Sequence, residues 1–120
     1  MTKRFLLITL ILVISTALIA CGKKYDKEIE EVSKLEEKSW NTDMISNAKK
    51  FDRNTSNFYV YNDGDIILVS YQSMKSTKDL STSMYYKNKT TGNYSENING
   101  KPKKFMKENK PDYKEENLKE

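Results

Sequence analysis

The chain has 120 residues, 37% of them hydrophobic, and its 21 Lys and Arg against 17 Asp and Glu give a net charge of +4. The first twenty residues hold 14 of the 44 apolar residues, and the remaining 100 residues carry 30, which is enough for one small domain. With no His and a single Cys, the composition excludes a His general base, a Ser-His-Asp triad, a His or multi-Cys metal site and an internal disulfide.

The N-terminus has the layout of a bacterial signal peptide. Two cations, Lys3 and Arg4, precede an apolar run over residues 5–20 that only three Thr and Ser residues interrupt. The run ends in Leu18, Ile19, Ala20 and Cys21. These four residues resemble the lipobox of bacterial lipoproteins, in which a diacylglycerol is joined to the Cys sulfur and the preceding peptide is removed. The resemblance implies that Cys21 is the lipidated N-terminus and that residues 1–20 are a lipoprotein signal peptide.

Two other interpretations of this segment stand beside lipidation. An uncleaved transmembrane anchor would use 16 residues, whereas a span takes about 20, and Lys23 and Lys24 balance the cations in front of the run. A secreted protein with a free thiol would place Cys21 at the cleavage point by coincidence. Lipidation with two or three acyl chains, palmitate among them, predicts a stable anchor on the extracytoplasmic face of the cell membrane.

The charge balance bears on the partner. Without the signal peptide the net charge is +2, because 19 basic residues then stand against 17 acidic ones. Only two of the 21 basic residues are Arg, whereas nucleic-acid recognition favours the bidentate contacts of Arg. We therefore expect no nucleic-acid partner, and a basic balance beside a membrane favours anionic headgroups. The Lys- and Asn-rich, Arg-poor composition is typical of an AT-rich genome and indicates a Gram-positive host.

Residues 25–51 predict a long helix with one apolar stripe. Steps of three to five residues place the apolar side chains on one face, with Lys and Glu on the other. The stripe consists of Tyr25, Ile29, Val32, Leu35, Trp40, Met44, Ala48 and Phe51. Asn41, Thr42 and Asp43 offer a capping sequence, so a break with a second helical segment is an alternative. Trp40 is read as a core anchor, with an exposed contact as the alternative.

A hairpin follows the helix. Residues 58–61 and 66–71 are rich in β-branched and aromatic side chains, and the Asp-Gly between them is a strong signal for a type I′ turn. This loop predicts that Val60 faces Ile67 and Phe58 faces Val69 on one side of the hairpin. Tyr59 then faces Leu68, and Tyr61 faces Ile66, on the other side, so that both faces are apolar.

The rest of the chain is more polar. Residues 83–87 and 93–98 predict a third and a fourth strand, joined at residues 90–92, and residues 75–82 form a polar connection. From residue 99 onward the composition predicts a mostly unstructured tail with at most a helical turn over 103–109. The predicted organisation is a lipidated N-terminus and linker over 21–24, a domain over 25–100 and a polar C-terminal tail over 101–120. The tail carries a cluster of lysines that we interpret as a solvated face or, alternatively, as a contact with the cell wall or with lipid headgroups. The cluster consists of Lys101, Lys103, Lys104, Lys107 and Lys110.

A helix followed by an antiparallel meander of about four strands is an α+β layout. Through the lipobox, the Lys- and Glu-rich helix and the Tyr-rich hairpin over residues 58–64, the chain resembles the small cystatin-like-fold lipoproteins of low-GC Gram-positive bacteria, a family of unknown function. The resemblance implies a cystatin-like fold, with the N-terminal helix packed on the meander. Members of this family often occur as cargo of phages or conjugative elements, so the resemblance also implies an accessory role for a mobile element.

The sequence offers few candidates for an inhibitory loop, a catalytic pair or a metal site. Inhibitory cystatins carry a Gln-x-Val-x-Gly loop, which residues 72–76 do not match. Asp63 and Asp65 are the only candidates for an acid/base pair. Both lie in the predicted turn, where Asp is a common residue, so the turn explains their presence without a catalytic role. The same residues resemble part of a calcium loop but lack its spacing and its distal Glu. We expect no catalytic residue, no metal and no cofactor, with a hydrolase as the least favoured hypothesis.

The second face of the hairpin is the candidate partner surface. Tyr59, Tyr61, Ile66 and Leu68 would form an exposed apolar patch, and such patches mark interfaces; the alternative is that the tail, the helix or sheet curvature covers them. The leading hypothesis is a non-enzymatic surface lipoprotein that binds another envelope protein. The alternative is a lipoprotein that binds a small ligand, a peptide or a lipid, in a pocket under the helix.

Overall fold

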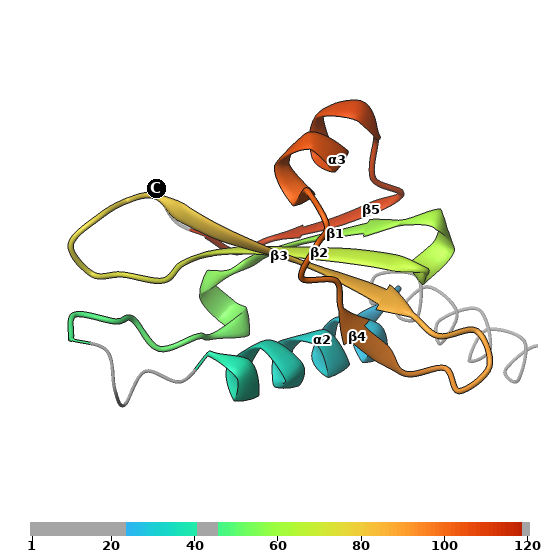
Figure 1. The fold of residues 1–120 in the computed structure, drawn as a ribbon, viewed down its shortest axis with the longest axis horizontal. Helices are drawn as coiled ribbons and strands as arrows, with labels where there is room; N and C mark the ends of the chain where they lie inside the picture. Colours follow the sequence, from blue (N-terminus) through green and yellow to red (C-terminus); the bar gives the residue numbers. More distant parts are fainter. Residues whose placement is uncertain (1–23, 41–45, 119–120) are drawn as a thin grey trace, which may run out of the picture.

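One helix lies across one face of a five-stranded antiparallel sheet, and a short second helix lies on the other face (Figure 1). The computed structural model describes residues 24–40 and 46–118, so the predicted lipobox Leu18–Cys21 lies outside the described residues. The elements are α2 (Asp26–Ser39), η1 (Arg53–Thr55), β1 (Asn57–Tyr61), η2 (Asn62–Gly64), β2 (Ile66–Gln72), β3 (Leu80–Lys87), β4 (Tyr94–Glu96), α3 (Pro102–Glu108) and β5 (Tyr113–Glu116). The strand order β4-β3-β2-β1-β5 confirms the predicted α+β class, with five strands where about four were expected. Within these ranges no helix combines the length and the apolar character that crossing a membrane requires.

Helix α2 is shorter than the helix that the apolar stripe predicted over residues 25–51. It starts with acidic residues in its first turn, which favour the positive end of the helix dipole, and it ends at Ser39. The continuation of the stripe as helix is wrong for the described residues after it, because Ala48 forms a β-bridge with Met74 and Phe51 reaches the core from non-helical backbone. Trp40 packs against the core and donates its indole N–H to the Lys49 carbonyl at 2.8 Å, as a core anchor should.

The hairpin register is confirmed pair by pair. Val60 lies opposite Ile67 and Phe58 opposite Val69, while Tyr59 and Tyr61 lie opposite Leu68 and Ile66. Asp63 and Gly64 have φ values of 54° and 97°, as a type I′ turn requires, and the Asp65 N–H donates to the Asn62 carbonyl at 3.1 Å. The Asp-Gly pair therefore sets the register that puts Phe58, Val60, Ile67 and Val69 against α2.

The C-terminal segment is part of the domain, and its prediction as a mostly unstructured tail is wrong. A helical turn was expected over residues 103–109, and α3 occupies nearly that range, but β5 was not expected. Strand β5 pairs antiparallel with β1, so it closes one edge of the sheet. Its residues Tyr113–Glu116 are mostly charged because an edge strand has one solvated side, and this composition is easily read as disorder.

The predicted partner surface is largely covered. Tyr61, Ile66 and Leu68 are buried, and Tyr59 is half-buried. They pack with Met84 and with Phe105 and Met106 of α3, and the rings of Tyr61 and Phe105 meet edge to face at 4.8 Å. Of the two alternatives left open for this face, coverage by the C-terminal segment is the one found, because that segment folds back as α3 and packs on it.

Candidate functional site

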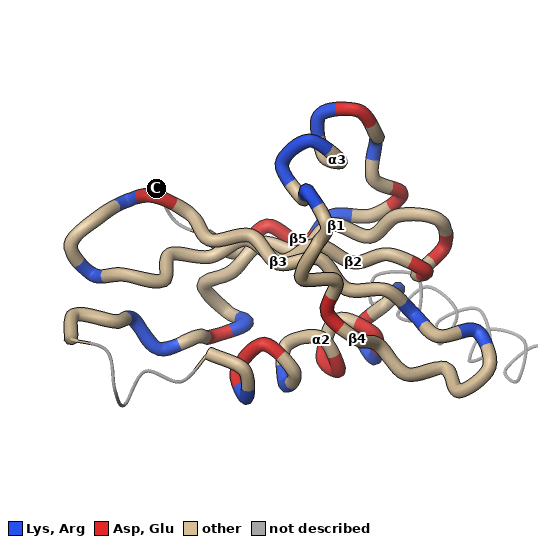
Figure 2. Tube along the Cα trace, viewed as in Figure 1, with Lys and Arg blue, Asp and Glu red and all other residues tan. Residues whose placement is uncertain are grey.

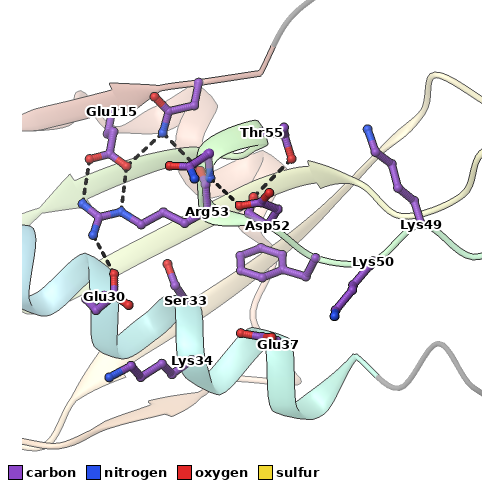
Figure 3. A pocket seen from close by; sticks show the side chains of 13 residues that line it. Glu30, Ser33, Lys34, Glu37, Lys49, Lys50, Asp52, Arg53, Thr55 and Glu115 are labelled. Atoms are coloured by element: carbon purple, nitrogen blue, oxygen red, sulfur yellow. Dashed lines mark hydrogen bonds and ion pairs between the residues drawn. The ribbon is translucent and has the colours of Figure 1, made fainter.

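A polar cleft lies between α2 and the segment that leads into β1 (Figure 3). Its volume is about 830 Å³, and it extends to the end of β5. Helix α2 forms one wall and residues 49–55 form the other, and among the lining side chains Phe51 is the one large apolar group. We call this space the Ser33 cleft, after the buried residue in its α2 wall.

Ser33 is the unusual residue of this cleft. It lies on the buried face of α2 and is 5% exposed. Its hydroxyl has no hydrogen-bond partner among the described residues, and Figure 3 shows it pointing from the helix toward the cleft. A buried polar group without a partner costs about 1–3 kcal/mol, so this hydroxyl calls for an explanation such as a bound group.

Arg53 holds one end of the cleft together. Its guanidinium binds Asp26 at 2.8 Å and Glu30 at 2.8 Å on α2, and Glu115 of β5 at 2.9 Å. The hydrogen bond to Glu115 raises the pKa of Arg53 above its already high ordinary value, with further contributions from Glu30 and Asp26, against burial, which lowers it. One residue of η1 thus ties α2 to the edge strand β5.

Charge is unevenly distributed along the Ser33 cleft. Figure 3 shows Lys49 and Lys50 at one end, and Arg53 with Glu30 and Glu115 at the other. Three carboxylates surround Arg53, so this end stays negative even with Lys34 one turn along the helix. At the opposite end two lysines accompany the carboxylate of Glu37, and the carboxylate of Asp52, which accepts from the Asn54 N–H at 2.9 Å, lies between the two ends (Figure 3). The arrangement suits a ligand with an ammonium group at one end and a carboxylate at the other.

A buried carboxylate lies one turn further along the same helix. Glu36 is 3% exposed, and its Oε1 accepts hydrogen bonds from the hydroxyls of Tyr71, at 2.5 Å, and Ser83, at 2.9 Å. The hydroxyl of Tyr85 donates to Oε2. Burial, reinforced by the bond to Glu36, raises the pKa of both tyrosines well above the ordinary value. This cluster fixes α2 on β2 and β3, and so fixes the wall that carries Ser33.

Asp63 and Asp65, the candidates for an acid/base pair, lie at the turn between β1 and β2 and form contacts there. The hydroxyl of Tyr25 donates to Asp63 at 2.5 Å, which with burial raises the pKa of Tyr25 to about 12. The N–H of Asp63 donates to the carboxylate of Asp112 at 2.9 Å, and Asp65 faces Lys89 at 3.9 Å. Neither Asp lines the Ser33 cleft.

Sequence reasoning missed Ser33, Glu36 and Arg53. Helical spacing carries a signal for the first two, because Ile29, Ser33 and Glu36 lie on one face of a helix. Arg53 has no local signal, since its partners are 23 to 62 residues away along the chain.

The comparisons with known proteins agree with this architecture. Residues 25–117 match the domain family described as a domain of unknown function with cystatin-like fold (DUF4467). The chain is similar to the crystal structure, at 1.35 Å resolution, of a DUF4467 family protein from Staphylococcus aureus subsp. aureus Mu50. The TM-score is 0.70 at 28% identity, over 79% of this chain and 99% of that chain.

None of the curated proteins compared matches the chain. The match over residues 25–117 extends past the predicted boundary at residue 100 and includes α3 and β5. The cystatin-like fold and the family resemblance expected from the sequence are both confirmed. The chain belongs to the DUF4467 family, whose domain of unknown function has a cystatin-like fold.

Proposed function

We propose that the protein is a membrane-anchored surface lipoprotein that binds a short peptide with free termini in the Ser33 cleft, without catalysing a reaction. The observation that carries the proposal is the buried hydroxyl of Ser33, which lacks a partner among the described residues and faces a cleft of about 830 Å³. A volume of this size is in the range of small-ligand sites.

The lining favours a peptide over a lipid. A lipid tail needs an apolar cavity, whereas this lining is charged and polar apart from Phe51. The carboxylates around Arg53 provide a place for a peptide ammonium group, and Lys50 provides one for a carboxylate. Ser33 between them can bond to a peptide carbonyl or N–H, because a hydroxyl both donates and accepts.

Ser33→Leu tests this binding. Ligand that binds only the folded state stabilises it, by about 1.4 kcal/mol at ten times Kd, so a pool of tripeptides with free termini is expected to raise the Tm of the wild type in a concentration-dependent way. Ser33→Leu places a bulky apolar side chain in the α2 wall of the cleft and should abolish the rise, while Ser39→Leu, at an exposed position of the same helix, should retain it. Calorimetry with each protein against its own ligand-free state measures this. An equal rise in all three proteins, or none in the wild type, contradicts the proposal.

Cys21→Ala tests the anchor. Lipidation requires the thiol as nucleophile, so labelling of growing cells with a palmitate analogue is expected to mark the wild type and not Cys21→Ala. Gly22→Ala keeps the thiol and should be labelled. Because Cys21 is the only Cys of the chain, label on Cys21→Ala, or its absence from the wild type, contradicts lipid anchoring at this residue.

The hypothesis of an envelope-protein partner stays a prediction, as does an accessory role for a mobile element. The surface predicted for that partner lies under α3, so the contact would have to use another face. The Ser33 cleft is the feature that favours the small-ligand alternative over it.

A further inference from the structure

Helix α3 has two different sides. Phe105 and Met106 pack on the sheet, while Lys103, Lys104 and Lys107 are exposed. Helical spacing puts these three lysines on the side away from the two apolar residues. None of them forms an ion pair with another described residue.

The net positive charge of the chain is concentrated here. Residues 101–110 contain five Lys and one acidic residue, Glu108, for a net charge of +4. The rest of the chain after residue 20 has 14 basic residues against 16 acidic ones, for a net charge of −2. Figure 2 shows Lys gathered over α3, on the face of the sheet opposite α2.

The segment that follows α3 returns to the start of the domain, on the face of the sheet that α2 covers. The ring of Tyr25 packs on the ring of Tyr113 at 5.7 Å, and Tyr113 follows Lys110 by three residues. Cys21 precedes Tyr25 by four positions, a reach of about 14 Å in an extended chain. A lipid on Cys21 would therefore keep the domain, with the exposed lysines of α3, within a short distance of the bilayer.

We propose that the lysines of α3 bind the anionic headgroups of the membrane to which the chain is anchored, so that the domain lies with α3 against the bilayer. The orientation rests on the lipidation proposed above. Because α2 lies on the opposite face of the sheet (Figure 1), a contact through α3 leaves the Ser33 cleft uncovered.

Vesicle binding of the lipid-free chain from Gly22 onward tests the headgroup contact independently of Cys21 and of the cleft. The solved relative is matched over 99% of its length, so a domain of this size folds as a chain of its own. Vesicles of phosphatidylcholine with one-third phosphatidylglycerol are expected to bind the chain in sedimentation, and pure phosphatidylcholine vesicles are not. High salt should release it by screening.

The triple variant Lys103→Gln, Lys104→Gln, Lys107→Gln is expected to bind about 100-fold more weakly, because each Lys near an anionic surface contributes about fivefold. The matched control Lys38→Gln, Lys75→Gln, Lys78→Gln removes the same charge from exposed positions away from α3 and should change binding little. Equal losses in the two variants, or no binding to the anionic vesicles, overturn the proposal. Tighter capture by soluble polyphosphate than by the vesicles overturns it in favour of a polyanion ligand.

Discussion

Glu36→Ala is expected to lower the free energy of unfolding by about 3 kcal/mol. The substitution leaves the buried hydroxyls of Tyr71 and Tyr85, and the half-buried hydroxyl of Ser83, without their acceptor, and each buried group without a partner costs about 1–3 kcal/mol. The substitution also removes the cost of burying the Glu36 charge, which offsets part of the loss of stability. Urea denaturation of the lipid-free chain, monitored by the fluorescence of Trp40, measures the change.

Three variants separate the hydrogen-bond network from general effects of substitution. Glu37→Ala removes a carboxylate from the adjacent, exposed position and should cost under about 0.5 kcal/mol. Glu36→Leu combined with Tyr71→Phe and Tyr85→Phe removes the acceptor together with its two tyrosine donors, and should recover much of the loss. If Glu36→Ala costs no more than Glu37→Ala, the buried carboxylate does not fix α2 on the sheet.

The domain is expected to lose about 4 kcal/mol of stability between pH 9 and pH 11. Burial is the main cause that raises the pKa of Tyr71, Tyr85 and Tyr94 above the ordinary value of 10.0. These hydroxyls stay protonated in the folded state while the unfolded chain ionises. The stabilisation is therefore complete below pH 10 and falls as the pH rises above it, by about 1.4 kcal/mol per unit for each group.

Urea denaturation at a series of pH values measures this loss. Tyr71→Phe removes one of the three groups, so its stability should fall about one-third less steeply above pH 10 even though it starts lower. Stability at pH 11 equal to that at pH 9 would contradict the burial of these hydroxyls.

The local parts of the fold were predictable from the sequence. Alternation of apolar residues and the Asp63-Gly64 turn gave the register of β1 and β2, because a type I′ turn fixes which residues face each other. The first half of the helical stripe, from Ile29 to Leu35, likewise predicted α2. In both cases the information lies within about ten residues of chain.

The parts that were missed depend on long-range pairing. Strand β5 is charged because it is an edge, and only its register with β1 distinguishes it from a solvated tail. The covering of Tyr61 by Phe105 depends on where that tail folds back. Glu36 has the spacing of a core residue and the charge of a surface residue, and its partners come from β2 and β3.

Ligand binding in the Ser33 cleft is tested most directly by amide chemical shifts of the ¹⁵N-labelled chain. A pool of tripeptides with free termini is expected to move the signals of Ser33, Lys50 and Arg53, and the same pool with acetylated and amidated ends is expected to move them much less. The signals of Tyr61 and Leu68, under α3, should stay in place. Shifts confined to residues outside the cleft, or equal shifts with free and blocked termini, would contradict the claim that the cleft binds both charged ends of a peptide.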